Sequence, residues 1–250
     1  MTRSSGRIND GLPKPRDRYP LGDSPLRVSP FCIGATADPH AVSAAFDAGI
    51  NFFFVTADMH WPCYEGVRRG LTMLLERGGG IRDDIVVGVV SYVTQPEFCF
   101  IPFLETLESI PKLERIDLTI MGGVYAPDFM VRARQYAGHR RGMVPGARSV
   151  GASFHDRPAV VMAVNHGMID IAFGRYNPAH SGAAVDLFPH LVPDRKPLLY
   201  GFSSTFQNVR PEQCDELGLP KENWRPAVTD YYRYSLTRRE HDGILCAPAT

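Results

Sequence analysis

The sequence predicts one (β/α)₈ barrel, or TIM barrel, from three observations. Its 250 residues include 44% hydrophobic residues, which is enough to bury one sizeable core. Eight short apolar or β-branched runs recur along the chain, and helix-like segments lie between them. Near-continuous apolar strands with helical crossovers are typical of a parallel sheet covered on both faces, and eight such units predict a closed barrel.

The expected elements follow from these runs in chain order. We expect strands at residues 30–35, 51–55, 84–90, 117–122, 147–153, 169–176, 197–203 and 243–248. Ahead of them, residues 19–29 are expected to form an N-terminal β-hairpin that closes the bottom of the barrel. The resulting domain organisation is a flexible N-terminal segment, 1–18, followed by a single barrel, 19–250.

Two of the intervening segments carry clear helical patterns. In residues 38–49, Gly49 is a suitable residue to end a helix whose apolar face carries Val42, Ala45 and Phe46. In residues 63–80, three glycines end a segment whose inward-facing residues are Val67, Leu71, Leu74 and Leu75. Both segments therefore predict helices between strands.

The charge balance and the cysteines exclude several classes of protein. The 27 basic residues equal the 27 acidic ones, so no strong field attracts nucleic acid or an anionic membrane. No stretch approaches the apolar length needed to span a bilayer, and residues 1–20 lack the apolar centre of a signal peptide, so we expect a cytoplasmic protein. The cysteines are odd in number, scattered and never in a CxxC pair. We therefore expect reduced thiols at Cys32, Cys63, Cys99, Cys214 and Cys246.

A barrel fold indicates where a functional site lies, because barrel active sites form at the C-terminal ends of the strands and in the loops that follow. After the second strand, His60 is the candidate acid/base, since an imidazole exchanges protons near neutral pH. The alternative is that His60 is only a polar histidine on the rim. Asp58 is the second catalytic candidate, and it is expected either to orient His60 or to cap the following helix.

The candidate substrate-binding residues follow the same rule. They are Thr56, Ser91, Tyr92, Ser153, His155, Arg175, Asn177, His180 and Ser203. Arg175 is expected either to bind a carboxylate or phosphate of the substrate or to form a surface salt bridge. No metal site is predicted, because the metal-capable residues are too bunched and fit no ligand motif: Asp58, His60, Cys63 and Glu65.

Six segments resemble, in order, the motifs of the aldo/keto reductase superfamily. They are residues 19–34, 45–61, 82–91, 115–123, 147–154 and 169–177, of which the second reads "AFDAGINFFFVTADMHW". The resemblance implies an aldo/keto reductase-like barrel with an N-terminal β-hairpin. It also implies an activity in which a nicotinamide cofactor passes hydride to a carbonyl.

The resemblance further implies where reductase chemistry would lie. The family uses a tetrad of Asp, Tyr, Lys and His, in which Tyr gives the proton to the carbonyl. Laid on this chain, the Asp falls on Val55, the Tyr on His60, the Lys on Val90 or Ser91, and the His on Gly122. We therefore expect a divergent member with a degenerate tetrad, because no lysine or carboxylate remains at those positions to tune a proton donor.

The cofactor side of the resemblance is weakened in the same way. The Ser-Asn pair that holds the nicotinamide amide corresponds to Ser153 and Phe154, and its Gln partner corresponds to Phe173. The sequence stops after "DGILCAPAT", where the family continues into a C-terminal cofactor-binding segment. We therefore expect no cofactor, and if NADPH does bind, Phe202 and Ser153 are the residues expected to contact it.

Three functional hypotheses follow. The preferred one is an enzyme that uses His60 in non-redox acid/base chemistry on a small polar metabolite, such as a proton transfer, elimination, cyclisation or hydrolysis. The alternatives are an NAD(P)H-dependent oxidoreductase with a substituted site and a catalytically silent barrel that binds a metabolite or a protein partner. None of them involves nucleic acid or a membrane, and the oligomeric state stays open.

Overall fold

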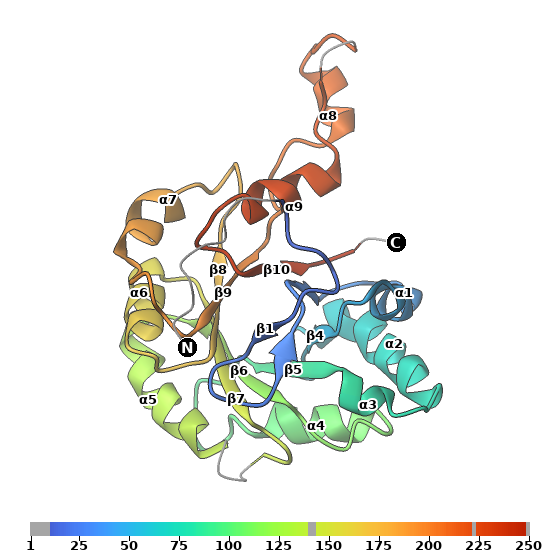
Figure 1. Cartoon of the computed structure of the whole chain (residues 1–250), viewed down its shortest axis with the longest axis vertical. Helices are drawn as coiled ribbons and strands as arrows, with labels where there is room; N and C mark the ends of the chain where they lie inside the picture. The colour runs from blue at the N-terminus through green and yellow to red at the C-terminus, as the bar shows by residue number, and fades with distance from the viewer. Residues whose placement is uncertain (1–10, 140–143, 222–223, 249–250) are drawn as a thin grey trace.

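The computed structural model describes residues 11–139, 144–221 and 224–248, and its centre is a closed barrel of eight parallel strands (Figure 1). The strands are β3 (Phe31–Ile33), β4 (Phe52–Val55), β5 (Val86–Ser91), β6 (Leu118–Val124), β7 (Ser149–Phe154), β8 (Ile171–Arg175), β9 (Leu198–Phe202) and β10 (Gly243–Cys246). The last strand pairs with both β9 and β3, which closes the ring. Each strand overlaps one predicted run, so the predicted barrel is confirmed. Of the segment expected to be flexible, residues 1–10 lie outside the described residues.

Helices lie between the strands, and most of them cover the outside of the barrel (Figure 1). They are α1 (His40–Ala48), η1 (Trp61–Tyr64), α2 (Glu65–Glu76), α3 (Ile81–Asp84), α4 (Ile101–Ser109), α5 (Ala126–Gly138), α6 (Arg157–Asn165), α7 (Ala183–Asp186), η3 (Phe188–His190), α8 (Pro211–Glu216) and α9 (Val228–Leu236). Both predicted helices are present. Helix α1 ends at Gly49, whose φ of 103° costs glycine little, and α2 buries Val67, Leu71, Leu74 and Leu75.

Alternation along the strands divides the apolar side chains into two layers. The interior layer fills the barrel and includes Phe52, Phe54, Val90, Ile120, Phe173 and Tyr200. The outer layer lies between the strands and the helices and includes Phe53, Val55, Val89, Met121, Ala152 and Leu199. A residue two positions beyond an interior side chain also faces the interior, so this division fixes which side chains at the strand ends point into the mouth.

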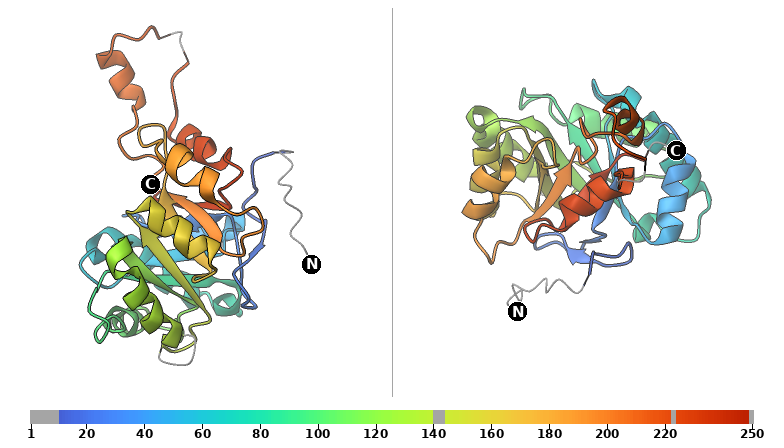
Figure 2. Two further views of the ribbon diagram at one scale, coloured as in Figure 1. Left: turned by 90° about the vertical axis from the view of Figure 1, so that its left-hand side faces the viewer. Right: turned by 90° about the horizontal axis from the view of Figure 1, so that it is seen from above.

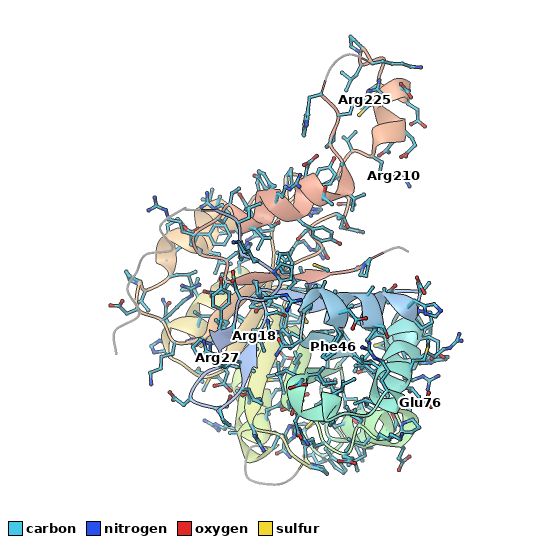
Figure 3. The ribbon with its side chains drawn as sticks, turned by 45° about the vertical axis from the view of Figure 1, so that its right-hand side comes forward. Arg18, Arg27, Phe46, Glu76, Arg210 and Arg225 are labelled. Carbon is cyan, nitrogen blue, oxygen red and sulfur yellow. The ribbon has the colours of Figure 1, made fainter. Side chains whose placement is uncertain are left out.

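The N-terminal hairpin closes the bottom of the barrel, as predicted. Its strands β1 (Tyr19–Pro20) and β2 (Arg27–Val28) pair antiparallel, and Leu21 and Val28 are fully buried in the interior layer. The Tyr200 hydroxyl reaches down from β9 and donates to the Ser29 carbonyl at 2.6 Å. Figure 3 shows Arg18 and Arg27 at this end, where a guanidinium nitrogen of Arg27 donates to the Arg18 carbonyl at 2.7 Å.

Carboxylates at the starts of three strands hold this bottom end together. Each accepts a backbone N–H from the strand before it: Asp117 from Val87 at 2.8 Å, Asp170 from Val150 at 2.8 Å, and Asp242 from Leu199 at 2.9 Å. Backbone donors are thereby satisfied where the regular strand ladder begins. The recurring pattern makes the bottom of the barrel a polar but closed network.

Helix α8 and the chain on either side of it project from the barrel as an arm (Figures 1 and 2). Arg225 and Asp215 form an ion pair at 2.9 Å within this arm, where Figure 3 labels Arg225. Leu217 and Trp224 leave 64% and 76% of their surfaces exposed, so the arm buries little apolar area.

The sequence also predicted reduced cysteines and no segment long enough to span a membrane. All five cysteines are free thiols, three of them buried, as expected. Across the described ranges, every helix is too short or too polar to cross a bilayer.

Candidate functional site

The side chains of the barrel mouth follow from the alternation of the strands. Tyr92, Gly122, Arg175 and Phe202 each stand two positions beyond a side chain of the interior layer, so they face the mouth. Ser153 faces it as well, because its neighbours Ala152 and Phe154 belong to the outer layer. The mouth is therefore built at the C-terminal ends of β5 to β9.

The ring of Tyr92 lies across the end of β6. A Cβ on Gly122 would lie 2.6 Å from Cδ1 of Tyr92, so only glycine leaves room for this ring. Burial raises the pKa of Tyr92 to about 12, and the negative charge of Asp58 adds to the shift. The phenol is therefore held in its protonated form over the position where the reductase resemblance places a histidine.

His60 lies against Tyr92 on the loop after β4. The two ring centroids are 4.3 Å apart and the rings meet edge to face, while the rest of His60 is exposed to solvent. An imidazole and a phenol, two groups that exchange protons in enzymes, are thus in contact at the mouth.

Asp58 fixes the loop that carries His60. One carboxylate oxygen accepts the backbone N–H of Tyr92 at 2.5 Å, and the other accepts the backbone N–H of His60 at 3.4 Å. The sequence offered Asp58 as a partner of the His60 ring or as a helix cap, and the geometry instead gives backbone contacts, since η1 has no side-chain cap. Asp58 therefore joins the His60 loop to the end of β5.

A groove of about 300 Å³ opens beside Tyr92, and His60 borders it through its neighbours Asp58 and Met59 without lining it. It is lined by the β4 and β5 loops, with Asp58, Met59, Tyr92, Val93, Thr94 and Gln95. Its size suits a small metabolite, because ligand pockets usually begin near 300 Å³.

The other half of the mouth is formed by β7, β8 and β9. His155 meets the Phe202 ring edge to face at 6.2 Å, and the Arg175 guanidinium lies 5.7 Å from the centroids of both Phe202 and Phe206. Burial lowers the pKa of His155, and the positive charge of Arg175 lowers it further. Tyr125, which is 55% exposed, stacks on His155 at 5.8 Å.

Arg175 has no acidic partner within the described residues, so the surface salt bridge considered for it is absent there. Its Nε is buried and finds no hydrogen-bond acceptor. The guanidinium is held by aromatic faces alone, which satisfy its charge in part but none of its N–H groups.

Gly123 connects the two halves of the mouth. Its φ is +58°, and a Cβ placed on it would lie 3.5 Å from Cδ1 of Tyr92 and 4.0 Å from Cδ2 of His155. The rings of Tyr92 and His155 therefore flank the same point, and the His60 half and the Arg175 half form one continuous rim.

Several predicted site residues are engaged inside the fold instead. The Thr56 hydroxyl donates to the Val90 carbonyl at 2.6 Å, and Ser91 is fully buried on the outer side of β5. Asn177 is also fully buried, and its side-chain nitrogen donates to the Ser203 carbonyl at 2.7 Å. The Asn177 oxygen accepts the His180 backbone N–H, also at 2.7 Å. These residues position the loops of the mouth.

Sequence reasoning missed three residues that shape the site: Tyr125, Phe206 and Arg132. Arg132 is 1% exposed on α5 and donates to the carbonyls of Gly122 at 2.9 Å and Ser91 at 3.2 Å. It thereby ties together the ends of β5 and β6 from behind the mouth. The helical spacing of Phe129, Arg132 and Tyr136, all buried on one face, was a signal that could have found it.

The positions that the resemblance assigns to tetrad and cofactor contacts are mostly apolar and packed. Val55 belongs to the outer layer, and the inward side chain beside it is Phe54, which packs on Phe173 at 5.2 Å. Phe173 is fully buried and offers no hydrogen bond to a nicotinamide amide. Within the described chain, no three His, Cys, Asp or Glu side chains converge as metal ligands would.

The likeness to known proteins lies in structure rather than sequence. No protein-family model matches the chain, and no curated protein matches it either. Among solved structures, AKR11C1, an aldo-keto reductase from Bacillus halodurans in its holo form, is 15% identical with a TM-score of 0.67, over 94% of this chain and 87% of that one. PA4992, assigned as an aldo-keto reductase from Pseudomonas aeruginosa, is 17% identical with a TM-score of 0.62, over 94% and 90%. Together with the closed barrel and the N-terminal hairpin, these neighbours show that the chain has the (β/α)₈ fold of the aldo-keto reductases.

Proposed function

We propose that this protein is an enzyme that acts on a small polar metabolite by acid/base chemistry without a nicotinamide cofactor. His60 is the group that exchanges the proton with the substrate, in a proton transfer, elimination, cyclisation or hydrolysis. The observation that carries the proposal is the contact of the exposed His60 ring with Tyr92 beside an open groove of about 300 Å³. Asp58 is a positioning residue in this proposal, because its carboxylate contacts only backbone N–H groups.

The environment of Tyr92 supports acid/base chemistry at His60 over hydride transfer. A tyrosine that protonates a carbonyl during reduction needs its pKa lowered towards working pH by neighbouring positive charge. Here burial and Asp58 raise the pKa of Tyr92 to about 12. An imidazole needs no such tuning to exchange protons near neutral pH, so His60 is the better proton carrier of the two.

One observation favours the reductase alternative. Ser153 and Phe202, the two residues expected to contact NADPH, both face the mouth. Fluorescence titration with NADPH and NADH distinguishes the two functions. We expect no saturation at micromolar cofactor, because Phe173 stands where an amide-binding side chain is needed. Saturation in that range would favour the reductase.

A screen for turnover in D₂O tests the proposal directly. Pools of small polar metabolites are incubated with the protein, and NMR follows product formation and deuterium incorporation. We expect His60→Ala to slow the conversion by about 10²–10⁴-fold, the usual effect of removing a positioned acid or base. The matched control is His166→Ala, because His166 is exposed at the end of α6, away from the mouth. Equal turnover by His60→Ala and wild type would contradict the role of His60, and ligand binding without any conversion would favour a silent barrel.

A further inference from the structure

Arg175 is the one mouth arginine whose hydrogen-bond donors are left over by the described fold. Arg132, behind the mouth, donates to two backbone carbonyls and to Asp128. Arg132 also has a buried Nε without an acceptor, so Arg175 differs from it in that none of its donors finds an acceptor in the described fold. A half-buried guanidinium at the mouth of a barrel with no acceptor in the described fold is suited to an acceptor supplied by a ligand.

The surroundings of Arg175 hold its guanidinium in place and leave its charge uncompensated. The guanidinium carbon of Arg175 lies 5.7 Å from the ring centroids of both Phe202 and Phe206. Ser153, on the adjacent strand, faces the same interior. Asp156, at the N-terminus of α6, accepts the backbone N–H groups of Ala126 at 3.1 Å and Ala159 at 3.3 Å, and no ion pair joins it to Arg175 in the described chain. A rigid, unpaired guanidinium binds an anion with little loss of conformational entropy.

We infer that Arg175 binds the carboxylate of a small substrate that has a planar, unsaturated body. The inference rests on the proposed function, since it names the class of substrate that His60 would act on. The carboxylate accepts hydrogen bonds from the guanidinium N–H groups of Arg175. The planar body packs on the rings of Tyr125 and Phe206, which are 55% and 50% exposed. The continuous rim through Gly123 then leaves the rest of the molecule to extend past Tyr92 towards His60.

A carboxylate fits this subsite better than a phosphate. Phosphate sites usually combine several cations or the free N–H groups of a helix N-terminus. Here one guanidinium is present, and at the starts of α5 and α6 the N–H groups of Tyr125, Ala126 and Ala159 are already accepted by Asp128 and Asp156. The single guanidinium carries one positive charge, which suits a monoanion.

Binding of three matched probes to the full chain tests this subsite, with dissociation constants measured by ¹⁵N–¹H NMR titration. The probes are benzoate, its neutral analogue benzamide, and phenyl phosphate. We expect benzoate to bind in the millimolar range and about 10–100-fold more tightly than benzamide, the range for a charge-assisted bidentate pair. Phenyl phosphate is expected to bind more weakly than benzoate. Equal binding of benzoate and benzamide, no benzoate binding at millimolar concentration, or tighter binding of phenyl phosphate would each overturn the inference.

Variants separate the subsite from the proposed catalysis. Arg175→Met should weaken benzoate by about 10–100-fold, and Arg175→Lys by less, because lysine keeps the charge but loses the fork. Arg134→Met is the matched control, since Arg134 is exposed on α5 and should leave the affinity unchanged. His60→Ala should also bind benzoate normally. Unchanged affinity in Arg175→Met overturns the carboxylate subsite and leaves the role of His60 standing, whereas normal turnover by His60→Ala defeats the proposed function and leaves the subsite standing.

Discussion

Two arginines at opposite ends of the barrel, Arg82 and Arg175, are partnered in opposite ways. At the bottom, Arg82 donates to the carbonyls of Leu113 at 2.6 Å and Arg115 at 2.7 Å, and to the Asp117 carboxylate at 3.0 Å. At the mouth, Arg175 has aromatic neighbours and no acceptor among the described residues. Arg82 thus cross-links the fold at the bottom, as Arg132 does behind the mouth, whereas Arg175 is left available.

This difference separates residues that hold the fold from residues that await a ligand. A polar network that satisfies its own members adds rigidity, as the strand-start carboxylates do. A buried polar atom without an internal partner lowers stability, so the unpartnered donors of Arg175 indicate a role in binding. We therefore expect variants at the bottom to lose unfolding free energy and variants at the mouth to lose ligand binding or turnover.

The largest effect on stability is expected from Asp117→Ala at the bottom. This change leaves the buried Arg82 guanidinium with backbone carbonyls but no carboxylate, and losing one partner of a buried ion pair typically costs about 3–5 kcal/mol of unfolding free energy. Urea unfolding followed by circular dichroism measures the loss. The control is Asp47→Ala, because Asp47 and its partner Arg77 are 58% and 44% exposed, and such pairs contribute about 0–1 kcal/mol. Similar losses in both variants would show that the bottom network adds no special stability.

A pH-dependent loss of stability is expected from His139, at the end of α5. Burial lowers the pKa of His139 to about 4, from about 6.5 in the unfolded chain. The fold therefore favours the neutral ring, and unfolding free energy should fall as the pH drops from about 6.5 towards 4, by at most about 3 kcal/mol. Comparison of wild type with His139→Gln at pH 7 and pH 5 isolates this contribution. A wild-type stability that falls no faster than that of the variant would contradict the assignment.

A smaller effect is expected where structure and site meet, at Asp58. Asp58→Ala removes the anchor between the His60 loop and β5, so we expect a loss of about 1–2 kcal/mol and a mobile His60 ring. Unfolding in urea gives the first quantity, and NMR relaxation of the ring gives the second. Asp38→Ala is the matched control, because Asp38 binds only the His40 backbone N–H in its own loop, at 2.9 Å. An immobile His60 ring in Asp58→Ala would remove the positioning role.

The fold could be predicted from sequence because it rests on long, redundant patterns. Each strand is an apolar run whose burial does not depend on one residue, and the 3.6-residue spacing of Val67, Leu71 and Leu74 marks a helix independently of its neighbours. An error of one or two residues at a strand end leaves the barrel unchanged. The hairpin was equally recoverable, since Leu21 and Val28 flank an obvious turn.

The site depended on details that these patterns do not specify. Ser91 and Tyr92 are adjacent and both were candidates, yet one faces the helices and the other the mouth, because a step of one residue reverses the side of a strand. The sequence also could not indicate that Arg175 has no acidic partner among the described residues, because its partners depend on which side chains lie near β8 in space. Tyr125 and Phe206 lie in loops, where no periodicity indicates the direction of a side chain.

The comparison between the two ends is tested most directly by one pair of urea unfolding curves, for Arg82→Met and Arg175→Met. Both changes replace an arginine by an unbranched apolar side chain of similar length. We predict that Arg82→Met loses about 3–5 kcal/mol, because the buried Asp117 loses its hydrogen-bonded guanidinium and keeps only Arg115, at 3.6 Å. Arg175→Met should stay within about 1 kcal/mol of wild type or gain stability, because no described acceptor loses a hydrogen bond. If Arg175→Met lost as much as Arg82→Met, the mouth arginine would be part of the fold and the distinction between the two ends would be contradicted.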